Sequence, residues 1–159
     1  MINPYHLRDL VIMPTLQYLE PEIEYSDAAV ELLMMTAAHE SKLGTYLKQL
    51  EGPARGIYQM ELVTEKDIIS NYLKYRDPLM MRVMGISHRH YREMNEIAMI
   101  ANLTYATAMA RVHYYRDPMP IPDVEDKIEL ANYCKRVWNT SHGKATSRQY
   151  YDAYMEMCM

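Results

Sequence analysis

The chain of 159 residues contains no phenylalanine, one tryptophan and only two cysteines, Cys134 and Cys158. Two cysteines without a Cys-x-x-Cys pair make neither a disulfide framework nor a zinc motif, so we expect free thiols and no cofactor. His88 and His90 lack a third ligand nearby in the sequence, and we expect no metal site there either.

Long apolar runs are also missing. No stretch approaches the roughly 18 apolar residues that span a bilayer, and the first residues, MINPYHLRDLVIMPTL, lack the basic start and apolar core of a signal peptide. The sequence therefore predicts a protein without a transmembrane segment or signal peptide, which another factor would have to carry out of the cytoplasm.

Positive charge is scarce as well. Lys and Arg number 17 against 21 acidic residues, so the net charge is −4 and the pI is about 5.9. This balance creates no basic field for nucleic acid or an acidic membrane, and we expect neither as a partner. The chain contains 15 tyrosines, whose rings suit the faces of sugars but can equally replace phenylalanine in a core.

Helical periodicity dominates the sequence, and its length fits one domain over 1–159. No stretch alternates clearly enough to predict a strand, although the irregular Gly44–Gln59 segment could form a small hairpin. Pro14 predicts a break or kink in the first helix, and the caps of later helices are expected at Ser26, Thr64, Asp123 and Thr146. The predicted helices are 4–20, 26–41, 64–75, 78–87, 91–116, 123–138 and a last one from 146 onward.

Glu40 is the first candidate for chemistry. When the helix over 26–41 is projected at 100° per residue, Glu40 falls beside Leu33 and Ala37, on the flank of its apolar stripe. Poor solvation and the negative helix end both favour the protonated acid and raise its pKa. A general acid that protonates a glycosidic oxygen near neutral pH needs this property. A boundary glutamate with its carboxylate in water would show the same pattern, so the position of Glu40 alone does not distinguish a general acid from a solvated boundary residue.

The residues after Glu40 carry a resemblance to a known family. Glu40-Ser41, then Gly56-Ile57-Tyr58-Gln59, then Thr64 resembles the soluble lytic transglycosylases and goose-type lysozymes. In that family Glu-Ser ends a helix, a loop leads to Gly-Leu-Met-Gln, and a Thr follows. The resemblance implies a mainly α, lysozyme-like domain in which the Gly44–Gln59 segment is an active-site loop or small hairpin.

The C-terminal half resembles the family less sharply. Asn102-Leu-Thr-Tyr105 fits a family helix that carries Asn and Tyr. A later family helix carries Ala-Ala-Tyr-Asn, whose Tyr bonds the catalytic Glu. Leu130-Ala-Asn-Tyr133 could match it, with Cys134 in place of the Asn, and Trp138-Asn139 is the alternative; we favour Tyr133. The stretch from 135 to 146 resembles the version of this domain found in bacteriophage proteins.

The resemblance implies a role for each of these residues. Glu40 would cleave the β-1,4 bond between N-acetylmuramic acid and N-acetylglucosamine in peptidoglycan, as acid and then as base. Ser41 would orient Glu40 or the substrate, and Tyr133 would hold Glu40. The residues expected to bind the glycan are Gly56, Ile57, Tyr58, Gln59, Tyr105 and Asn139.

The product of cleavage depends on a second carboxylate. A lytic transglycosylase needs none, because the sugar's own 6-hydroxyl closes a 1,6-anhydro ring. Hydrolysis normally uses a second carboxylate to position water, and Glu61 stands where goose-type lysozymes have an Asp. We favour transglycosylation, with Glu61-assisted hydrolysis as the alternative.

A third interpretation is a phage structural or adaptor domain that keeps the fold without the activity, for which Cys134 in place of Asn speaks. The partners expected from the resemblance are peptidoglycan glycan strands and, for a virion component, other phage virion proteins. The expected location is the phage virion, or the host cytoplasm with delivery to the periplasm or cell wall.

Overall fold

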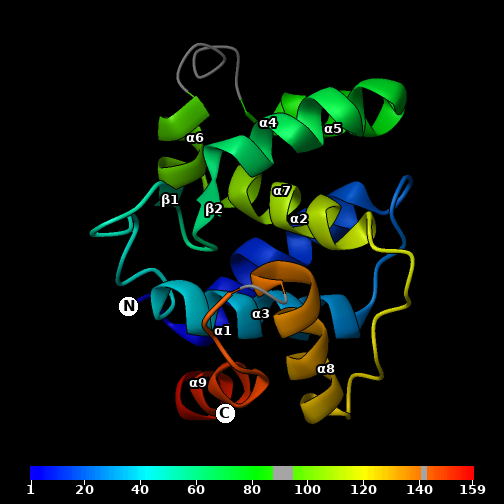
Figure 1. Ribbon diagram of the computed structural model, residues 1–159. Coiled ribbons are helices and arrows are strands. Elements are labelled where there is room, and N and C mark those ends of the chain that lie inside the picture. The colour runs from blue at the N-terminus through cyan, green and yellow to red at the C-terminus, as the bar shows by residue number, and fades with distance from the viewer. Residues whose placement is uncertain (88–94, 141–142) are drawn as a thin grey trace.

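The computed structural model describes residues 1–87, 95–140 and 143–159, and the mainly α class predicted from the sequence is confirmed (Figure 1). Helical elements follow one another along the chain, interrupted by one small hairpin. The elements are α1 (Pro4–Leu7), the π-helix η1 (Arg8–Ile12), α2 (Met13–Leu19), α3 (Asp27–Ser41), β1 (Ala54–Arg55), β2 (Met60–Glu61), α4 (Leu62–Asn71), the 3-10 helix η2 (Leu73–Tyr75), α5 (Asp77–Ile86), α6 (Asn95–Ala101), α7 (Leu103–Tyr115), α8 (Lys127–Cys134), the π-helix η4 (Lys135–Asn139) and α9 (Ser147–Cys158).

Helix α3 forms the centre of the core. Every residue from Leu32 to Ala38 is buried, and the helix contacts η1, α7, α8 and α9. Its predicted cap is confirmed, because the Ser26 hydroxyl accepts a hydrogen bond from the Ala29 amide at 3.1 Å. The helix ends at Lys42 and Leu43, which both have a φ of +49°, so the chain turns away sharply directly after Glu40-Ser41.

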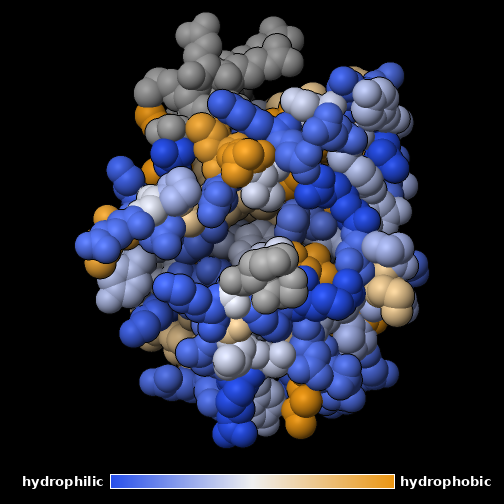
Figure 2. Space-filling view, viewed as in Figure 1, coloured by the Kyte–Doolittle hydropathy of each residue, from blue (hydrophilic) through white to orange (hydrophobic). Residues whose placement is uncertain are grey.

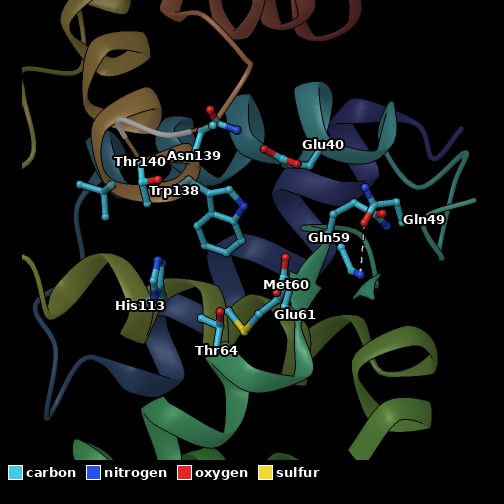
Figure 3. A pocket seen from close by; sticks show the side chains of 13 residues that line it. Glu40, Gln49, Gln59, Met60, Glu61, Thr64, His113, Trp138, Asn139 and Thr140 are labelled. Carbon is cyan, nitrogen blue, oxygen red and sulfur yellow. Dashed lines mark hydrogen bonds between the residues drawn. The ribbon is translucent and has the colours of Figure 1, made fainter. Parts of the chain in front are cut away.

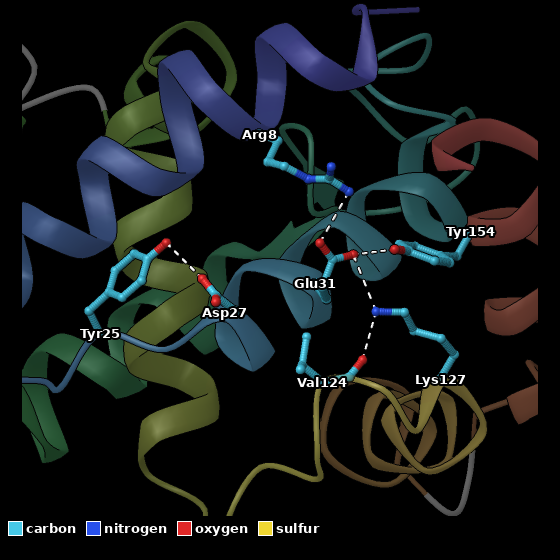
Figure 4. Close-up of polar contacts among 7 residues, drawn as sticks. All are labelled: Arg8, Tyr25, Asp27, Glu31, Val124, Lys127 and Tyr154. Atoms are coloured by element: carbon cyan, nitrogen blue, oxygen red, sulfur yellow. Dashed lines mark hydrogen bonds and ion pairs between the residues drawn. The ribbon is translucent and has the colours of Figure 1, made fainter.

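A carboxylate inside this core joins four elements. Glu31 on α3 accepts a hydrogen bond from the Tyr154 hydroxyl on α9, and its other oxygen lies 3.1 Å from a guanidinium nitrogen of Arg8 on η1 (Figure 4). The ammonium of Lys127 on α8 lies 3.8 Å from Glu31 and donates to the Val124 carbonyl at 2.7 Å. Because partners of opposite charge surround Glu31, burial does not leave its charge uncompensated.

Several predicted helix boundaries are wrong for local reasons. The helix predicted over 91–116 is two helices, α6 and α7, because Asn102 lies between them and its side chain accepts from the Tyr105 amide at 2.9 Å. The start predicted at Tyr91, and the pair His88 and His90, lie outside the described residues.

Two predicted caps are also wrong. Helix α4 begins at Leu62, before Thr64, because extended Glu61 ends β2 immediately before it. Helix α8 begins at Lys127, and its cap is Asp126 rather than Asp123. The cap at Thr146 is confirmed as a capping box with Gln149. At Pro14 the first helix does not stop, but it changes from the π-helix η1 to the α-helix α2 just before this residue. The change of helix type accommodates the backbone N–H that proline lacks.

The segment after α3 contains the small hairpin that the sequence left open. Strands β1 and β2 pair antiparallel, with Ala54 opposite Glu61 and Arg55 opposite Met60. Gly56 begins the turn with a φ of +75°, and a β-carbon there would collide with the carbonyl oxygen of Met99 on α6. Glycine is therefore required at this position for two reasons, its backbone conformation and the close approach of α6.

We expect Gly56→Ala to lower the free energy of unfolding by about 2 kcal/mol or more, because it combines an unfavourable φ with a backbone collision. Urea unfolding followed by circular dichroism measures the change. Gly85→Ala is the matched control: Gly85 lies in α5, and the nearest atom to an added β-carbon is the Tyr18 hydroxyl at 3.4 Å. The control should be neutral or slightly stabilising, and equal effects of the two substitutions would contradict the role given to Gly56.

Candidate active site

A cleft of about 550 Å³ lies where the C-terminal end of α3 faces the hairpin (Figure 3). Side chains from α3, the hairpin, α4, α7 and η4 converge on it, and Figure 2 shows a hollow near the middle of this face with mostly hydrophilic residues around it. The lining residues are Glu40, Gln49, Ala54, Gln59, Met60, Glu61, Thr64, His113, Val137, Trp138, Asn139, Thr140 and Gly143. Both predicted catalytic residues, Glu40 and Glu61, are therefore in one cavity.

Glu40 forms the α3 side of the cleft. It is half-buried, and its carboxylate accepts a hydrogen bond from the hydroxyl of Tyr150 on α9. Burial raises the pKa of Glu40 to about 7, while the hydrogen bond from Tyr150, which favours the charged form, opposes the rise. The Tyr150 ring also lies against the His39 ring, with centroids 4.0 Å apart, so the phenol is held through its ring as well as through its hydroxyl. The result is an acid that exchanges its proton near neutral pH.

Gln59 forms the opposite wall. Its backbone has a φ of +50°, which is unusual for a residue with a side chain. Its amide nitrogen donates to the carbonyls of Gly56 at 2.8 Å and Tyr46 at 3.2 Å. The amide oxygen accepts no hydrogen bond from the described residues and is therefore free to accept one from a ligand.

Glu61 and Thr64 continue this wall. Glu61 ends β2 and is exposed, and Thr64 lies in the first turn of α4. Because Glu61 shares the cavity with Glu40, two carboxylates in different surroundings face one space: one half-buried beside a phenol and one in water. Such a pair divides acid and base roles between its members.

The third side is built by η4 and the loop after it. The Lys135 ammonium donates to the Asn139 side-chain oxygen at 2.6 Å and to the carbonyls of Thr140 and Gly143, both at 2.8 Å. Thr140 has a φ of +62° and a ψ of 174°, a conformation that side chains rarely adopt. These three bonds hold Asn139 and Thr140 at the cleft in spite of the strain.

His113 and Trp138 form the floor between these walls, and neither was a primary candidate from the sequence. Their rings meet edge to face, with centroids 5.0 Å apart. Burial and the nearby Arg116 guanidinium lower the pKa of His113 to about 4, although the hydrogen bond with the Val137 backbone opposes the shift, so the ring is neutral at pH 7. An Arg116 nitrogen lies 3.1 Å from His113 Nδ1, which makes that nitrogen the acceptor.

The prediction that Tyr133 holds Glu40 is wrong. The Tyr133 hydroxyl donates to the Met119 carbonyl at 3.0 Å and lines a different cavity. Tyr150 takes the expected place because α9 packs directly along α3, whereas Tyr133 on α8 points to the segment that precedes α8. The signal in the sequence was the pair Tyr150 and Tyr154, one turn apart in a helix capped at Thr146, which marks the buried face of α9.

Most of the predicted glycan-binding residues do not line the cleft. Ser41, Gly56, Ile57, Tyr58 and Tyr105 are all buried. Ser41 instead ends α3, donating to the Ala37 carbonyl and accepting from the Gly44 amide at 2.8 Å. Of the predicted set, only Gln59 and Asn139 reach the cavity, because the other side chains are needed to pack the walls from behind.

Two of these buried residues make polar contacts inside the core. The Tyr58 hydroxyl lies 3.1 Å from the Thr107 hydroxyl, and the Tyr105 hydroxyl donates to Glu65 at 2.7 Å. Both tyrosines connect the hairpin and α4 to α7, so they support the cleft without contacting its interior.

Comparisons with protein-family models, with curated proteins and with solved structures give no match for this chain. Within residues 1–87, 95–140 and 143–159 there is no group of three or more metal-ligating side chains. Over the same residues no helix has the length and apolar character that crossing a bilayer requires. Inferences about function therefore rest on the chemistry of the cleft.

We expect Tyr150→Phe to raise the pKa of Glu40 above 7, by about one unit or more, because the lost hydrogen bond favours the ionised carboxylate. A pH titration of the glutamate side-chain carbons by NMR measures it. Tyr154→Phe is the matched control, since Tyr154 lies one turn along α9 and bonds Glu31 instead. An unchanged Glu40 pKa in Tyr150→Phe, or the same change in both variants, would contradict the assigned contact.

Glu40→Gln should change stability in a pH-dependent way. The raised pKa of Glu40 means that the unfolded chain ionises first as pH rises. Wild type therefore loses up to about 3 kcal/mol relative to Glu40→Gln between about pH 4.5 and 7, and the two are similar at lower pH. Urea unfolding across this range measures the difference. Glu156→Gln, at an exposed position of α9, is the control for removal of a carboxylate; a flat difference for Glu40→Gln would show that the Glu40 pKa is ordinary.

Proposed function

We propose that this protein is a peptidoglycan-cleaving muramidase of lysozyme-like architecture, in which Glu40 is the general acid/base. The observation that carries the proposal is Glu40 itself: a half-buried acid with a pKa of about 7, bonded to a tyrosine and facing a polar cleft. An acid that is protonated near neutral pH but able to release its proton is what cleavage of a glycosidic bond requires.

The proposed reaction is lytic transglycosylation of the β-1,4 bond between N-acetylmuramic acid and N-acetylglucosamine. Glu40 donates its proton to the bridging oxygen as the bond from the muramic acid C1 breaks, and N-acetylglucosamine leaves with a free hydroxyl. The 6-hydroxyl of the muramic acid then bonds to C1, and its proton returns to Glu40. The Tyr150 hydroxyl, which donates to the carboxylate, stabilises Glu40 while it is ionised between the two steps.

The remaining groups of the cleft suit a glycan. The free amide oxygen of Gln59 and the side chain of Asn139 supply polar contacts, and the Trp138 ring supplies an apolar surface for a sugar face. The lysozyme-like architecture is supported by the same arrangement, in which an acid at the end of a buried helix faces a small hairpin. A phage source, and virion proteins as partners, remain predictions from the resemblance.

Hydrolysis is the second candidate, and Glu61 favours it. Its carboxylate is exposed in the same cavity as Glu40, where it could orient a water molecule toward C1. The two reactions give different products, so product analysis decides between them.

The decisive experiment incubates purified peptidoglycan with wild type, Glu40→Gln, Glu61→Gln and the surface control Glu156→Gln, and identifies released muropeptides by mass spectrometry. We expect anhydro-muropeptides from wild type, Glu61→Gln and Glu156→Gln, and a loss of at least about 100-fold in Glu40→Gln. Products heavier by one water, lost in Glu61→Gln, would instead establish hydrolysis.

Circular dichroism shows whether each variant is folded. No release from folded wild type, or equal release from wild type and Glu40→Gln, would refute the proposed activity and favour a non-catalytic structural or adaptor domain.

A further inference from the structure

A second cavity, of about 710 Å³, lies beside the segment that joins α7 to α8 and shares no lining residue with the cleft. In Figure 1 this segment runs along the edge of the molecule, in yellow, between the end of α7 and the start of α8. Pro118, Pro120 and Pro122 stiffen it. The volume is within the range of roughly 300–1,000 Å³ that is typical of small-molecule sites.

The unusual feature of this cavity is Arg111 on α7, a buried arginine among its lining residues. The side chain is 6% exposed, and its Nε is buried without a hydrogen-bond partner. Among the described residues its guanidinium forms no ion pair, and its aromatic neighbour is Tyr115, whose ring centroid is 5.5 Å away. Burial of a guanidinium without a carboxylate partner destabilises the fold, and a ligand carboxylate that pairs with it would offset this cost.

Carboxylates surround the cavity but do not neutralise Arg111. Glu24, Asp27 and Asp123 line it and are exposed. The fourth acid, Asp117, is already engaged by Arg136, whose two terminal nitrogens bond its two oxygens at 2.7 and 2.8 Å. The cavity is therefore bipolar, with one buried cation inside and three acids in water around it.

The walls that hold these charges are fixed before any ligand binds. The carbonyl of Val124, at the end of the connecting segment, accepts a hydrogen bond from the Lys127 ammonium at 2.7 Å. That ammonium is also paired with Glu31 (Figure 4). The Tyr133 hydroxyl holds the Met119 carbonyl at 3.0 Å. Asp27 is oriented by the Tyr25 hydroxyl, 3.2 Å away.

We propose that this cavity binds a short peptide or amino acid that carries both a free carboxylate and an ammonium group, the carboxylate on Arg111 and the ammonium among Glu24, Asp27 and Asp123. A guanidinium pairs with a carboxylate in a planar, two-bonded geometry, which would satisfy the unpartnered Nε–H of Arg111. A ligand with only negative charge would be repelled by the three acids, whereas a zwitterion matches both signs. The site is independent of the proposed cleavage activity.

The experiment titrates the full chain with lysylglycine, which carries both groups, and follows the backbone amides of Met119, Ile121, Asp123 and Val124 by NMR. Two matched probes remove one charge each: lysylglycinamide lacks the carboxylate, and lysylglycine acetylated on both amines lacks the ammonium groups. We expect saturable shifts with lysylglycine and affinity at least about tenfold weaker for either analogue. No saturable shift in the 119–124 segment, or equal binding of lysylglycine and its amide, would overturn the proposal.

Two further measurements test the assigned groups. Arg111→Met should abolish binding while leaving the protein folded, because no internal ion pair is lost, and Arg148→Met, at an exposed position of α9, should bind like wild type. Binding retained in Arg111→Met would refute the role of Arg111. Tighter binding of inorganic phosphate than of lysylglycine would refute the zwitterionic ligand class, and this comparison needs no variant.

Discussion

The cleft depends on the way α3 is buried. Because α3 is covered by η1, α7, α8 and α9, the two glutamates it carries beside α9 need partners from other elements. Tyr154 and Tyr150, one turn apart, each donate a hydroxyl to one of them, Glu31 and Glu40. Glu31 also has two cations beside it, Arg8 and Lys127. For Glu40, burial is the largest influence on the pKa. The first carboxylate therefore ties the fold together, and the second has a pKa raised to about 7.

Non-glycine residues with positive φ occur both at this cavity and at the end of α3, where Lys42 and Leu43 adopt such values. Gln59 and Thr140 have positive φ values without being glycine, and each is held by hydrogen bonds to nearby groups. The Lys135 ammonium and the neutral His113 ring both contact η4 or the loop after it. Backbone strain persists only where the surroundings over-determine it, and it is commonest where a site must be preorganised. The strain at Gln59 and Thr140 lies at the proposed active site, whereas that at Lys42 and Leu43 ends α3.

Local chemistry in the sequence was sufficient for much of the fold. The mainly helical class, the helix over 27–41 with its Ser26 cap, and the cap at Thr146 depend on contacts within a few residues, and all are confirmed. The position of Glu40 on the flank of α3 follows from helical periodicity alone, which is why its raised pKa was predictable. The caps predicted at Thr64 and Asp123 were wrong because β2 ends directly before α4, so that this helix begins at Leu62, and because the side chain of Asp126 caps α8 instead.

Only the tertiary structure decided which distant groups meet. Tyr150 rather than Tyr133 bonds Glu40, because the packing of α9 against α3 brings together residues 110 positions apart, and no local pattern encodes that pairing. Other long-range contacts bury Tyr58 and Tyr105, bring His113 and Trp138 into the cleft, and leave Arg111 without a carboxylate partner among the described residues. The sequence by itself determined the helices and the acid, since these follow from short-range periodicity and capping. The partners of that acid and the second cavity depend on long-range packing, which only the folded chain specifies.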